Sequence, residues 1–234
     1  MTTLRLTFIS DTHSQHQGLM IEPGDVLIHC GDFTARGDLD DTMDFAQFMA
    51  AQNFTHKIVI AGNHDWCFED KRRQSAEACL EDHEIIYIND SAVEIGGIRF
   101  WGSPIQPEFL HWAFNRQRGA DIRKHWQQIP DDTDVLITHG PAFGILDACT
   151  NGRRVGCEDL LETIQRIKPS VHACGHIHES FGIREQDGTL FINACNLNER
   201  YQLSHPPVVV DVEVDPGTGR VSPISNQKSP GISL

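Results

Sequence analysis

The sequence predicts a mixed α/β fold in which two β-sheets pack together and helices cover the outside. Short apolar runs with strand character alternate with helix-like segments in the first half of the chain, and the second half is richer in hairpins. The length of 234 residues and the 39% share of hydrophobic residues suffice for one large domain with a buried core. We therefore expect a single domain over residues 1–215 and a loosely ordered tail over residues 216–234, which is rich in Pro, Gly and Ser.

The first half of the chain begins with three strand-like runs, at Leu4–Ser10, Asp25–Cys30 and Lys57–Ala61. The second and third are short, contain β-branched residues and are followed by glycine, which is typical of buried strands that lead into sharp loops. Between them, Asp40–Ala51 has large apolar residues at near-helical spacing behind acidic residues. This pattern predicts an amphipathic helix.

The middle of the chain continues the alternation. Glu69–Asp82 is predicted as a polar helix and Glu84–Ile88 as a strand. Ser91–Gly102 has the pattern of a hairpin with a Gly-Gly turn. Phe114–Gln128 is predicted as a helix that carries four basic residues.

The last third is predicted to contain one helix among several strands. The strands are expected at Val135–Thr138, Val171–Cys174, Leu190–Ala194 and Val208–Val214. The helix is expected at Glu158–Ile167, with Pro169 ending it.

The composition excludes several classes of function. A formal net charge of −14 without a basic run disfavours long nucleic acid as a partner. A small phosphate ester is compatible with this charge, since one or two bound cations reverse the field locally. No apolar stretch is long enough to span a bilayer, and the N-terminal residues enter a strand pattern directly, without a signal-peptide pattern. We expect a cytoplasmic protein without a membrane partner.

The seven cysteines form no CxxC pair, and the chain is too large to need disulfides for stability. They are expected to be buried, reduced side chains.

Five short polar motifs each follow an apolar run. They are Asp11-Thr12-His13, Gly31-Asp32, Gly62-Asn63-His64-Asp65, Thr138-His139-Gly140-Pro141 and Gly175-His176-Ile177-His178. Taken singly each is weak, because an aspartate after a strand is usually a turn residue and a lone histidine is usually structural. Their shared position changes this, because α/β sheets gather binding residues at the carboxyl ends of their strands. Glycine accompanies four of the five and allows tight turns.

The motifs together supply seven oxygen or imidazole donors and no thiolate: Asp11, His13, Asp32, Asn63, His139, His176 and His178. Such a donor set suits divalent ions, with Mn expected and Fe, Zn, Ni or Co compatible. Seven donors are too many for one tetrahedral ion and fit two ions that share a carboxylate. A pair of this kind is the usual arrangement for phosphate-ester hydrolysis, in which a water that bridges the cations becomes the nucleophile.

The ordered motifs DTH, GDF, GNHD, THGP and GHIH resemble those of the calcineurin-like metallophosphoesterases. The variant GDFT, GNHD, THGP, CGHIHE and the later INAC…PPVVVDV is similar to the small MPPED-like branch, which includes class III cyclic-nucleotide-phosphodiesterase-like proteins. The resemblance implies an αββα sandwich with a dinuclear metal site. It implies that Asp11, His13 and His178 bind the first metal, that Asn63, His139 and His176 bind the second, and that Asp32 bridges them.

The residues beside Asn63 are expected to act in catalysis. The resemblance implies that His64 faces the substrate and donates a proton to the leaving oxygen or stabilises the phosphoryl group. Asp65 either orients His64 through a hydrogen bond or caps the turn that follows.

Other polar residues are weaker candidates. His16 lies close to the first motif in sequence and is the one remaining histidine considered for the pocket. Arg153 and Arg154 are either phosphate contacts or a solvated pair. Asn193 and Asn196 follow a late strand and are considered for the pocket rim.

The leading functional prediction is a phosphodiesterase that hydrolyses small diesters, with cyclic nucleotides as a plausible class. A phosphomonoesterase or protein phosphatase with the same metals is the alternative. A non-catalytic scaffold is disfavoured because His64 and all seven donors are retained. A homodimer is compatible with the sequence, with a contact through Phe114–Gln128 or the Ser91–Gly102 hairpin.

Overall fold

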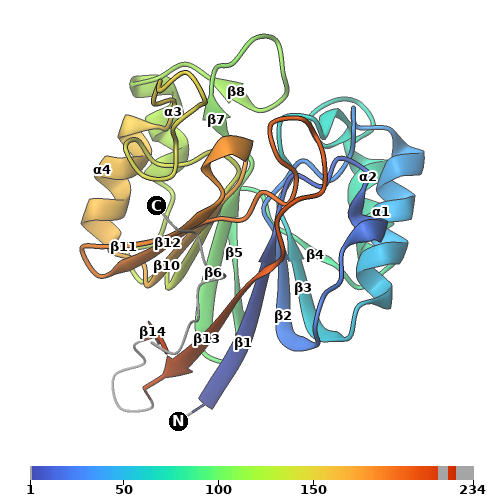
Figure 1. Ribbon diagram of the computed structural model, residues 1–234, viewed down its shortest axis with the longest axis horizontal. Helices are drawn as coiled ribbons and strands as arrows, with labels where there is room; N and C mark the ends of the chain where they lie inside the picture. The colour runs from blue at the N-terminus through green and yellow to red at the C-terminus, as the bar shows by residue number, and fades with distance from the viewer. Residues whose placement is uncertain (1, 216–220, 225–234) are drawn as a thin grey trace.

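The structure is a computed structural model that describes residues 2–215 and 221–224. Two six-stranded sheets pack face to face, and helices lie on the outer face of each (Figure 1). This is the predicted αββα sandwich, and the two layers come from the first and second halves of the chain, apart from the C-terminal strands.

The first sheet has the strand order β14-β13-β1-β2-β3-β4. Its strands are β1 (Thr2–Ile9), β2 (Gly24–His29), β3 (Phe54–Val59), β4 (Ile86–Tyr87), β13 (Val208–Val214) and β14 (Val221–Pro223). Strands β1 to β4 are parallel, whereas β13 returns antiparallel to β1. Helices α1 (Leu39–Ala51) and α2 (Arg73–Glu81) cover the outer face (Figure 1).

The second sheet has the order β11-β12-β10-β9-β6-β5. Its strands are β5 (Ser91–Ile95), β6 (Ile98–Ser103), β9 (Val135–Thr138), β10 (Val171–Cys174), β11 (Gly182–Gln186) and β12 (Thr189–Asn193). The four inner strands are parallel and both edge strands are antiparallel to their neighbours. Helices α3 (Ala120–Trp126) and α4 (Glu158–Ile167) cover its outer face. A two-stranded ribbon of β7 (Gln106–Pro107) and β8 (Asn115–Arg116) lies beyond the end of β6, at the top of Figure 1.

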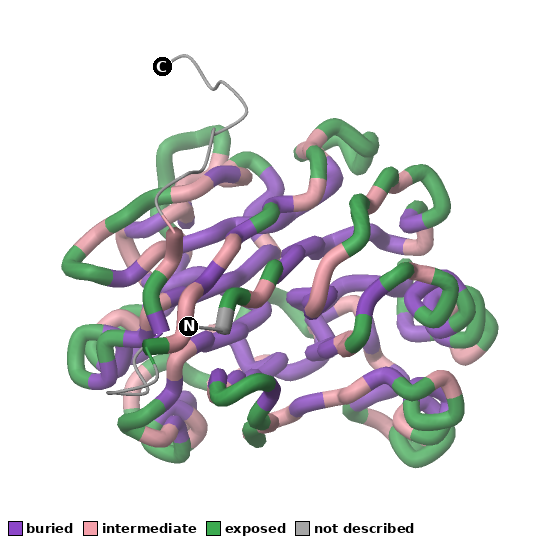
Figure 2. Tube along the Cα trace, turned by 90° about the horizontal axis from the view of Figure 1, so that it is seen from below, coloured by how far each residue is buried: buried purple, intermediate pink, exposed green. Residues whose placement is uncertain are grey.

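The alternation of side chains along each strand divides the core into layers. In β2, Val26 and Ile28 belong to the apolar layer between the sheets, while Leu27 packs with the helices. In β9, Val135 and Ile137 likewise face the other sheet. Figure 2 shows the consequence, with buried segments through the middle of the molecule and exposed segments around it.

Most predicted strands and two predicted helices are confirmed within two or three residues. The helix Glu158–Ile167 has the predicted bounds, and the Gly-Gly turn of the predicted hairpin joins β5 to β6. The helix predicted at Glu69–Asp82 begins only at Arg73, after a 3-10 turn η2 at Trp66–Phe68.

The helix predicted at Phe114–Gln128 was wrong in its first part. Asn115–Arg116 forms β8, and only Ala120–Trp126 is helical. Phe114 and Gly119 have φ angles of 59° and 83°, which a right-handed helix cannot contain. The edge strand β11 and the short strand β7 were not predicted from the sequence.

The predicted tail falls mostly outside the described residues. Of residues 216–234 the structure describes 221–224, and Val221–Pro223 pairs with β13 as β14.

All seven cysteines are unpaired, and six of them are buried. Within residues 2–215 and 221–224, no helix is long and apolar enough for a membrane crossing.

The parallel strands of both sheets direct their carboxyl ends to the same end of the sandwich. The loops that follow β1 and β2 are joined there by backbone hydrogen bonds, from Asp11 N–H to Gly31 O and from His13 N–H to Asp32 O. The loop after β3 is joined to them through the Asp65 carboxylate, which accepts from the Asp32 N–H. The loops after β9 and β10 are joined by a backbone hydrogen bond from Gly175 N–H to His139 O. The five motifs therefore meet between the two sheets.

Candidate metal centre

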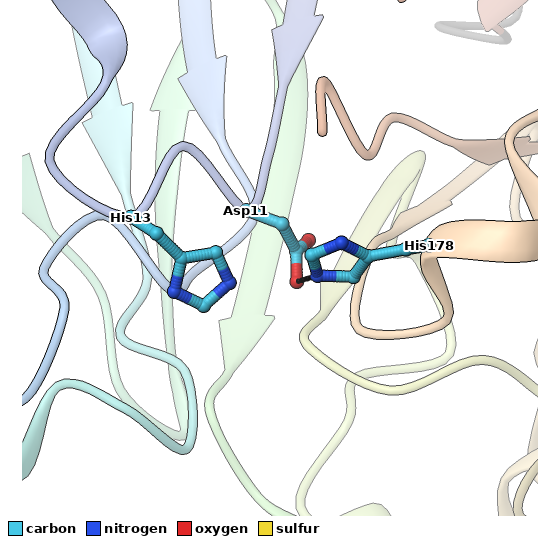
Figure 3. Close-up of side chains that lie close together, drawn as sticks. All are labelled: Asp11, His13 and His178. Carbon is cyan, nitrogen blue, oxygen red and sulfur yellow. Dashed lines mark ion pairs between the residues drawn. The ribbon is translucent and has the colours of Figure 1, made fainter. Parts of the chain in front are cut away.

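Among residues 2–215 and 221–224, three groups of potential metal ligands have ligand atoms within 4.8 Å of one another, and Asp11, His13 and His178 form the first. Asp11 and His13 come from the loop after β1 and His178 from the loop after β10. Figure 3 shows Asp11 between the two imidazoles, with Asp11 Oδ1 3.4 Å from His178 Nε2. The first and fifth motifs, far apart in sequence, thus form one cluster.

Asp32, His139 and His176 form the second group, and Asp32 also groups with His13 and His64. Asp32 Oδ2 lies 3.4 Å from His139 Nε2 and 3.8 Å from His13 Nε2. One carboxylate oxygen therefore faces the two clusters at once.

Asn63 joins the second group through its side-chain oxygen. Asn63 Oδ1 lies 3.0 Å from His139 Nε2, and both side chains are buried. All seven predicted donors are thus brought together by loops from both sheets.

The backbone that carries these donors is unusual. Asp11, His13, Asp32 and His176 have φ angles of 53°, 40°, 57° and 67°. Non-glycine residues rarely adopt this left-handed conformation, and clusters of such residues are typical of functional sites. The conformation turns each side chain back toward the space between the sheets.

Two motif glycines are required for close approach. A Cβ atom on Gly175 would lie 2.0 Å from Asp11 Oδ2, and one on Gly62 would lie 2.3 Å from Asp32 Oδ1. Neither glycine has a positive φ angle, so their role is to make space for the carboxylates. Gly31 is required both for its backbone conformation, with a φ angle of 99°, and for space, because a Cβ atom there would lie 2.6 Å from His139 Nδ1.

The two carboxylates are buried and remain ionised because imidazoles surround them. Burial raises the pKa of Asp11 and Asp32, but the neighbouring histidines outweigh this effect and hold both pKa values below the usual range. Burial lowers the pKa of His139, and Asp32 more than offsets this and brings it to about 9. His178 reaches about 9 in the same way through Asp11. A cation that binds here must displace these protons.

The chemistry of the remaining donors fits a metal ion. Burial lowers the pKa of His13 to about 4 and that of His176 to about 3, so both rings are neutral and able to bind a cation. Both ring nitrogens of His13 are buried without a hydrogen-bond partner. An unpartnered buried imidazole is costly unless a ligand completes it. This is the observation that most directly favours a bound metal.

His64 lies at the edge of the first cluster. Its backbone N–H donates to Asp32 Oδ1 at 2.7 Å, and its Nδ1 lies 2.8 Å from Ala35 O. Its ring stacks on Trp112 with centroids 4.0 Å apart and stands edge-on to His13 at 4.5 Å. His64 therefore lies beside His13 and Asp32, and it is not part of the group formed by Asp32, His139 and His176.

Asp65 does not orient His64, contrary to one sequence-based expectation. Its carboxylate accepts hydrogen bonds from the backbone N–H groups of Asp32, Thr34 and Gly62 and from the Thr34 hydroxyl, at 2.6–2.9 Å. It makes no side-chain cap to η2 either. Burial and the charge of Asp32 raise the pKa of Asp65 to about 7, against these hydrogen bonds. Asp65 joins the second and third motif loops.

The weaker candidates lie behind or outside the cluster. The buried ring of His16 packs between Phe45 and Phe48, with Nε2 2.9 Å from an Asp44 carboxylate oxygen. Asn193 and Asn196 are buried and hydrogen-bonded to backbone beneath the loops.

Arg153 and Arg154 are exposed, in keeping with a solvated pair. Arg154 pairs with the buried Asp147 at 2.8 Å.

Two side chains that bind Asp11, those of Ser10 and Cys195, were not predicted from the sequence. Asp11 Oδ2 accepts hydrogen bonds from the Ser10 hydroxyl, the Cys195 thiol and the backbone N–H of His176. Ser10 precedes the first motif directly, which is the one clue to its role. Cys195 reaches Asp11 through an isolated bridge between Ser10 and Cys195, which no local pattern predicts.

Comparison with known proteins agrees with this geometry. The sequence profile of the calcineurin-like phosphoesterases matches residues 4–180, which contain all five motifs. The chain belongs to the calcineurin-like phosphoesterase family.

Relatives of this phosphoesterase place it in the MPPED-like branch. Human metallophosphoesterase domain-containing protein 1 is 38% identical over 230 residues, covering 89% of this chain and 71% of the relative. A UPF0046 protein of Caenorhabditis elegans is 35% identical over 243 residues, covering 92% of this chain and 61% of the relative. The crystal structure of TT1561 from Thermus thermophilus shares the fold, with a TM-score of 0.57, 11% identity, and coverage of 82% of this chain and 89% of that one.

Family membership implies a phosphoester hydrolase that uses divalent metal ions. The calcineurin-like phosphoesterase described here has a full set of candidate ligands for them, gathered at the carboxyl ends of its parallel strands.

Proposed function

We propose that this protein is a dinuclear metal-dependent phosphodiesterase that hydrolyses small phosphodiesters, with cyclic nucleotides as a candidate class. The observation that carries the dinuclear proposal is the position of Asp32, whose Oδ2 atom faces His13 and His139 at once. The preference for diesters rests on the resemblance to the MPPED-like branch and on the absence of a sizeable insertion in the sequence that would shape a polymer site.

In this proposal the ligands divide into two sets. Asp11, His13 and His178 would hold the first ion, Asn63, His139 and His176 the second, and Asp32 would bridge them. When bound, two divalent cations polarise the phosphoryl group and lower the pKa of water to near neutrality. The orphaned nitrogens of His13 and the ionised, buried carboxylates support this assignment.

Hydrogen bonds from the protein orient both carboxylates. Asp32 Oδ1 accepts the backbone N–H of His64, which leaves Oδ2 directed at His13 and His139. Asp11 Oδ2 accepts from the Ser10 hydroxyl and the Cys195 thiol, and the His176 N–H lies 2.9 Å from Oδ2 and 3.1 Å from Oδ1. Oδ1 is the less occupied oxygen and lies 3.4 Å from His178 Nε2. Hydrogen bonds of this kind orient ligands and commonly change metal affinity by roughly 10- to 100-fold when they are removed.

His64 is the proposed proton donor. Ala35 O can only accept, so Nδ1 of His64 carries the hydrogen and Nε2 is the nitrogen that exchanges a proton. In the protonated ring, Nε2–H would donate to the leaving oxygen of the ester. The Ala35 carbonyl and the Trp112 ring hold the imidazole in this orientation.

The proposal is tested by comparing bis(p-nitrophenyl) phosphate with p-nitrophenyl phosphate in the presence of Mn²⁺. We expect a higher kcat/KM for the diester, measured by release of p-nitrophenol. A large excess of monoester turnover would instead support the phosphomonoesterase alternative.

Two substitutions separate metal binding from proton transfer. Asp32→Ala should remove metal and abolish activity, because it deletes the oxygen that faces both clusters. His64→Ala should lower kcat by on the order of 10²- to 10⁴-fold while the metal content stays nearly unchanged. Metal analysis of both purified variants beside the rate measurements decides this, and full activity in either variant contradicts the assignment.

A further inference from the structure

Two half-exposed aromatic side chains lie against the proposed ligands, although neither was predicted from the sequence. Tyr201 is 50% exposed, and its ring centroid lies 5.0 Å from those of His13 and of His178. Phe109 is 51% exposed and stands edge-on to His176 at 6.1 Å. One ring therefore lies beside each proposed metal position, and about half of each remains accessible.

The Tyr201 ring is held in place by its loop. Its backbone has a φ angle of 56°, and its N–H donates to Asn198 O, which also lies 3.0 Å from His178 Nδ1. The side-chain amide of Gln15, from the loop after β1, donates to Tyr201 O at 3.1 Å. The ring is thus tied to the same loops that carry His13 and His178.

The Phe109 ring is held in a comparable way. Its backbone N–H and O are both hydrogen-bonded to the Asn115 side-chain amide, at 3.2 and 3.1 Å. In the same loop, Ala113 N–H donates to Asn63 O at 3.2 Å. The loop between β7 and β8 is therefore fastened to the third motif.

We propose that Tyr201 and Phe109 form a binding surface for an aromatic group carried by the substrate, such as a nucleobase or an aryl ester. The proposal rests on the proposed function, because it assigns the part of the substrate next to the phosphoryl group. A planar ring that covers the free half of either side chain removes apolar surface from water and gains ring stacking. A sugar phosphate or a phosphorylated side chain without a ring lacks that gain.

The experiment measures binding of phenylphosphonate and methylphosphonate to the metal-loaded protein by calorimetry. Both ligands carry the same anionic head and neither has an ester bond to be cleaved, so the difference in affinity reports the ring alone. We expect the wild-type protein to bind phenylphosphonate about 10-fold more tightly. Equal affinity for the two ligands would overturn the proposal.

Variants assign the preference to the two rings. Tyr201→Leu and Phe109→Leu keep an apolar side chain without a ring, and each should reduce the preference by roughly 2- to 10-fold. Tyr201→Phe keeps the ring and should keep the preference. Leu110→Ala is the matched control, since Leu110 is 66% exposed in the same loop as Phe109. A preference that is unchanged in both leucine variants would refute the role of these side chains.

A second substrate pair separates this inference from the proposed function. Phenyl p-nitrophenyl phosphate and methyl p-nitrophenyl phosphate release the same leaving group. The ratio of their kcat/KM values, compared between wild type and Tyr201→Leu, cancels their intrinsic reactivities. If the protein hydrolyses neither diester, the proposed phosphodiesterase function is refuted. If it hydrolyses both and Tyr201→Leu leaves the ratio of kcat/KM values unchanged, the aromatic surface at Tyr201 is refuted.

Discussion

At the scale of single residues, the candidate centre is shaped before any ion arrives. Four of the seven proposed ligands have left-handed backbone, and hydrogen bonds from the protein orient the carboxylates of Asp11 and Asp32. Each strained residue costs on the order of 1–3 kcal/mol, which the surrounding packing must offset. The benefit is that the ligands need little rearrangement on binding.

Gly175 provides a test at this scale. Gly175→Ala would place a Cβ atom 2.0 Å from both Asp11 Oδ2 and Ser10 Oγ, so the loop or the carboxylate must move. We expect metal affinity to fall by about 10-fold or more. Titration of the metal-free variant with Mn²⁺ measures the change.

Gly140→Ala is the matched control for that substitution. Gly140 also belongs to a motif, but a Cβ atom there meets only Gln106 Cβ at an ordinary 3.6 Å, without a positive φ angle. Its metal affinity should match that of the wild type. Equal affinity in the Gly175 variant would mean that the close approach to Asp11 is dispensable.

The seven donors could be predicted from the sequence because each belongs to a motif that directly follows an apolar, strand-like run. The sequence did not predict the hydrogen bonds of Asp65 or the position of Tyr201. The Asp65 carboxylate binds atoms from the preceding motif loop, and Tyr201 lies in a loop that is placed by Asn198 and Gln15. Such contacts depend on the folded arrangement and leave no pattern in the neighbouring residues.

At the scale of elements, buried strands were the most predictable part of the fold. β9 and β10 are buried throughout, so their apolar runs match their strand bounds. The segment Phe114–Gln128 was harder, because its charged residues fit a helical face while Gly119 interrupts the backbone. Strand β8 is held by pairing with β7 and not by its own composition.

The pairing of β9 with β10 includes a buried histidine that should make stability depend on pH. The Thr138 hydroxyl donates to Gly140 O, so it must accept its second hydrogen bond from His172 Nε2–H. Burial lowers the pKa of His172 from 6.5 to about 3. As the pH falls, His172 therefore takes up a proton in the unfolded chain before it does so in the native protein. The contribution of neutral, buried His172 to the free energy of unfolding is complete above pH 6.5 and is lost between about pH 6.5 and 3.

His172→Gln keeps a donor and removes the titration. Between pH 7 and 5, the wild type should lose about 2 kcal/mol more unfolding free energy than the variant. Denaturant unfolding of both metal-free proteins at the two pH values measures this difference. The contributions of all other titratable groups are common to both proteins and cancel. An identical pH dependence would show that His172 does not titrate on unfolding.

At the scale of the whole molecule, the candidate centre joins the two sheets. Asp11, His13, Asp32 and Asn63 follow strands of the first sheet, whereas His139, His176 and His178 follow strands of the second. A metal bound to both sets stabilises the native packing of one sheet on the other, because the unfolded chain lacks the preformed site.

Removal of metal should therefore lower the melting temperature. At a free metal concentration 100-fold above Kd, one site contributes about 2.7 kcal/mol, which corresponds to roughly 5–10 °C for a chain of this size. Differential scanning calorimetry with and without a chelator measures the shift. Asp32→Ala should show a much smaller one, and an equal response in that variant would mean that the stabilising ion binds elsewhere.

The contact between Asp11 and Cys195 has a consequence for synthesis of the protein. During synthesis the Asp11 carboxylate leaves the ribosome before the thiol that binds it, which follows 184 positions later. The contact that orients Asp11 can therefore form only after Cys195 has been made. A nascent chain that has not reached His178 holds the ligands of the first sheet without the full set of the second, so the complete set exists only after residue 178 has been made.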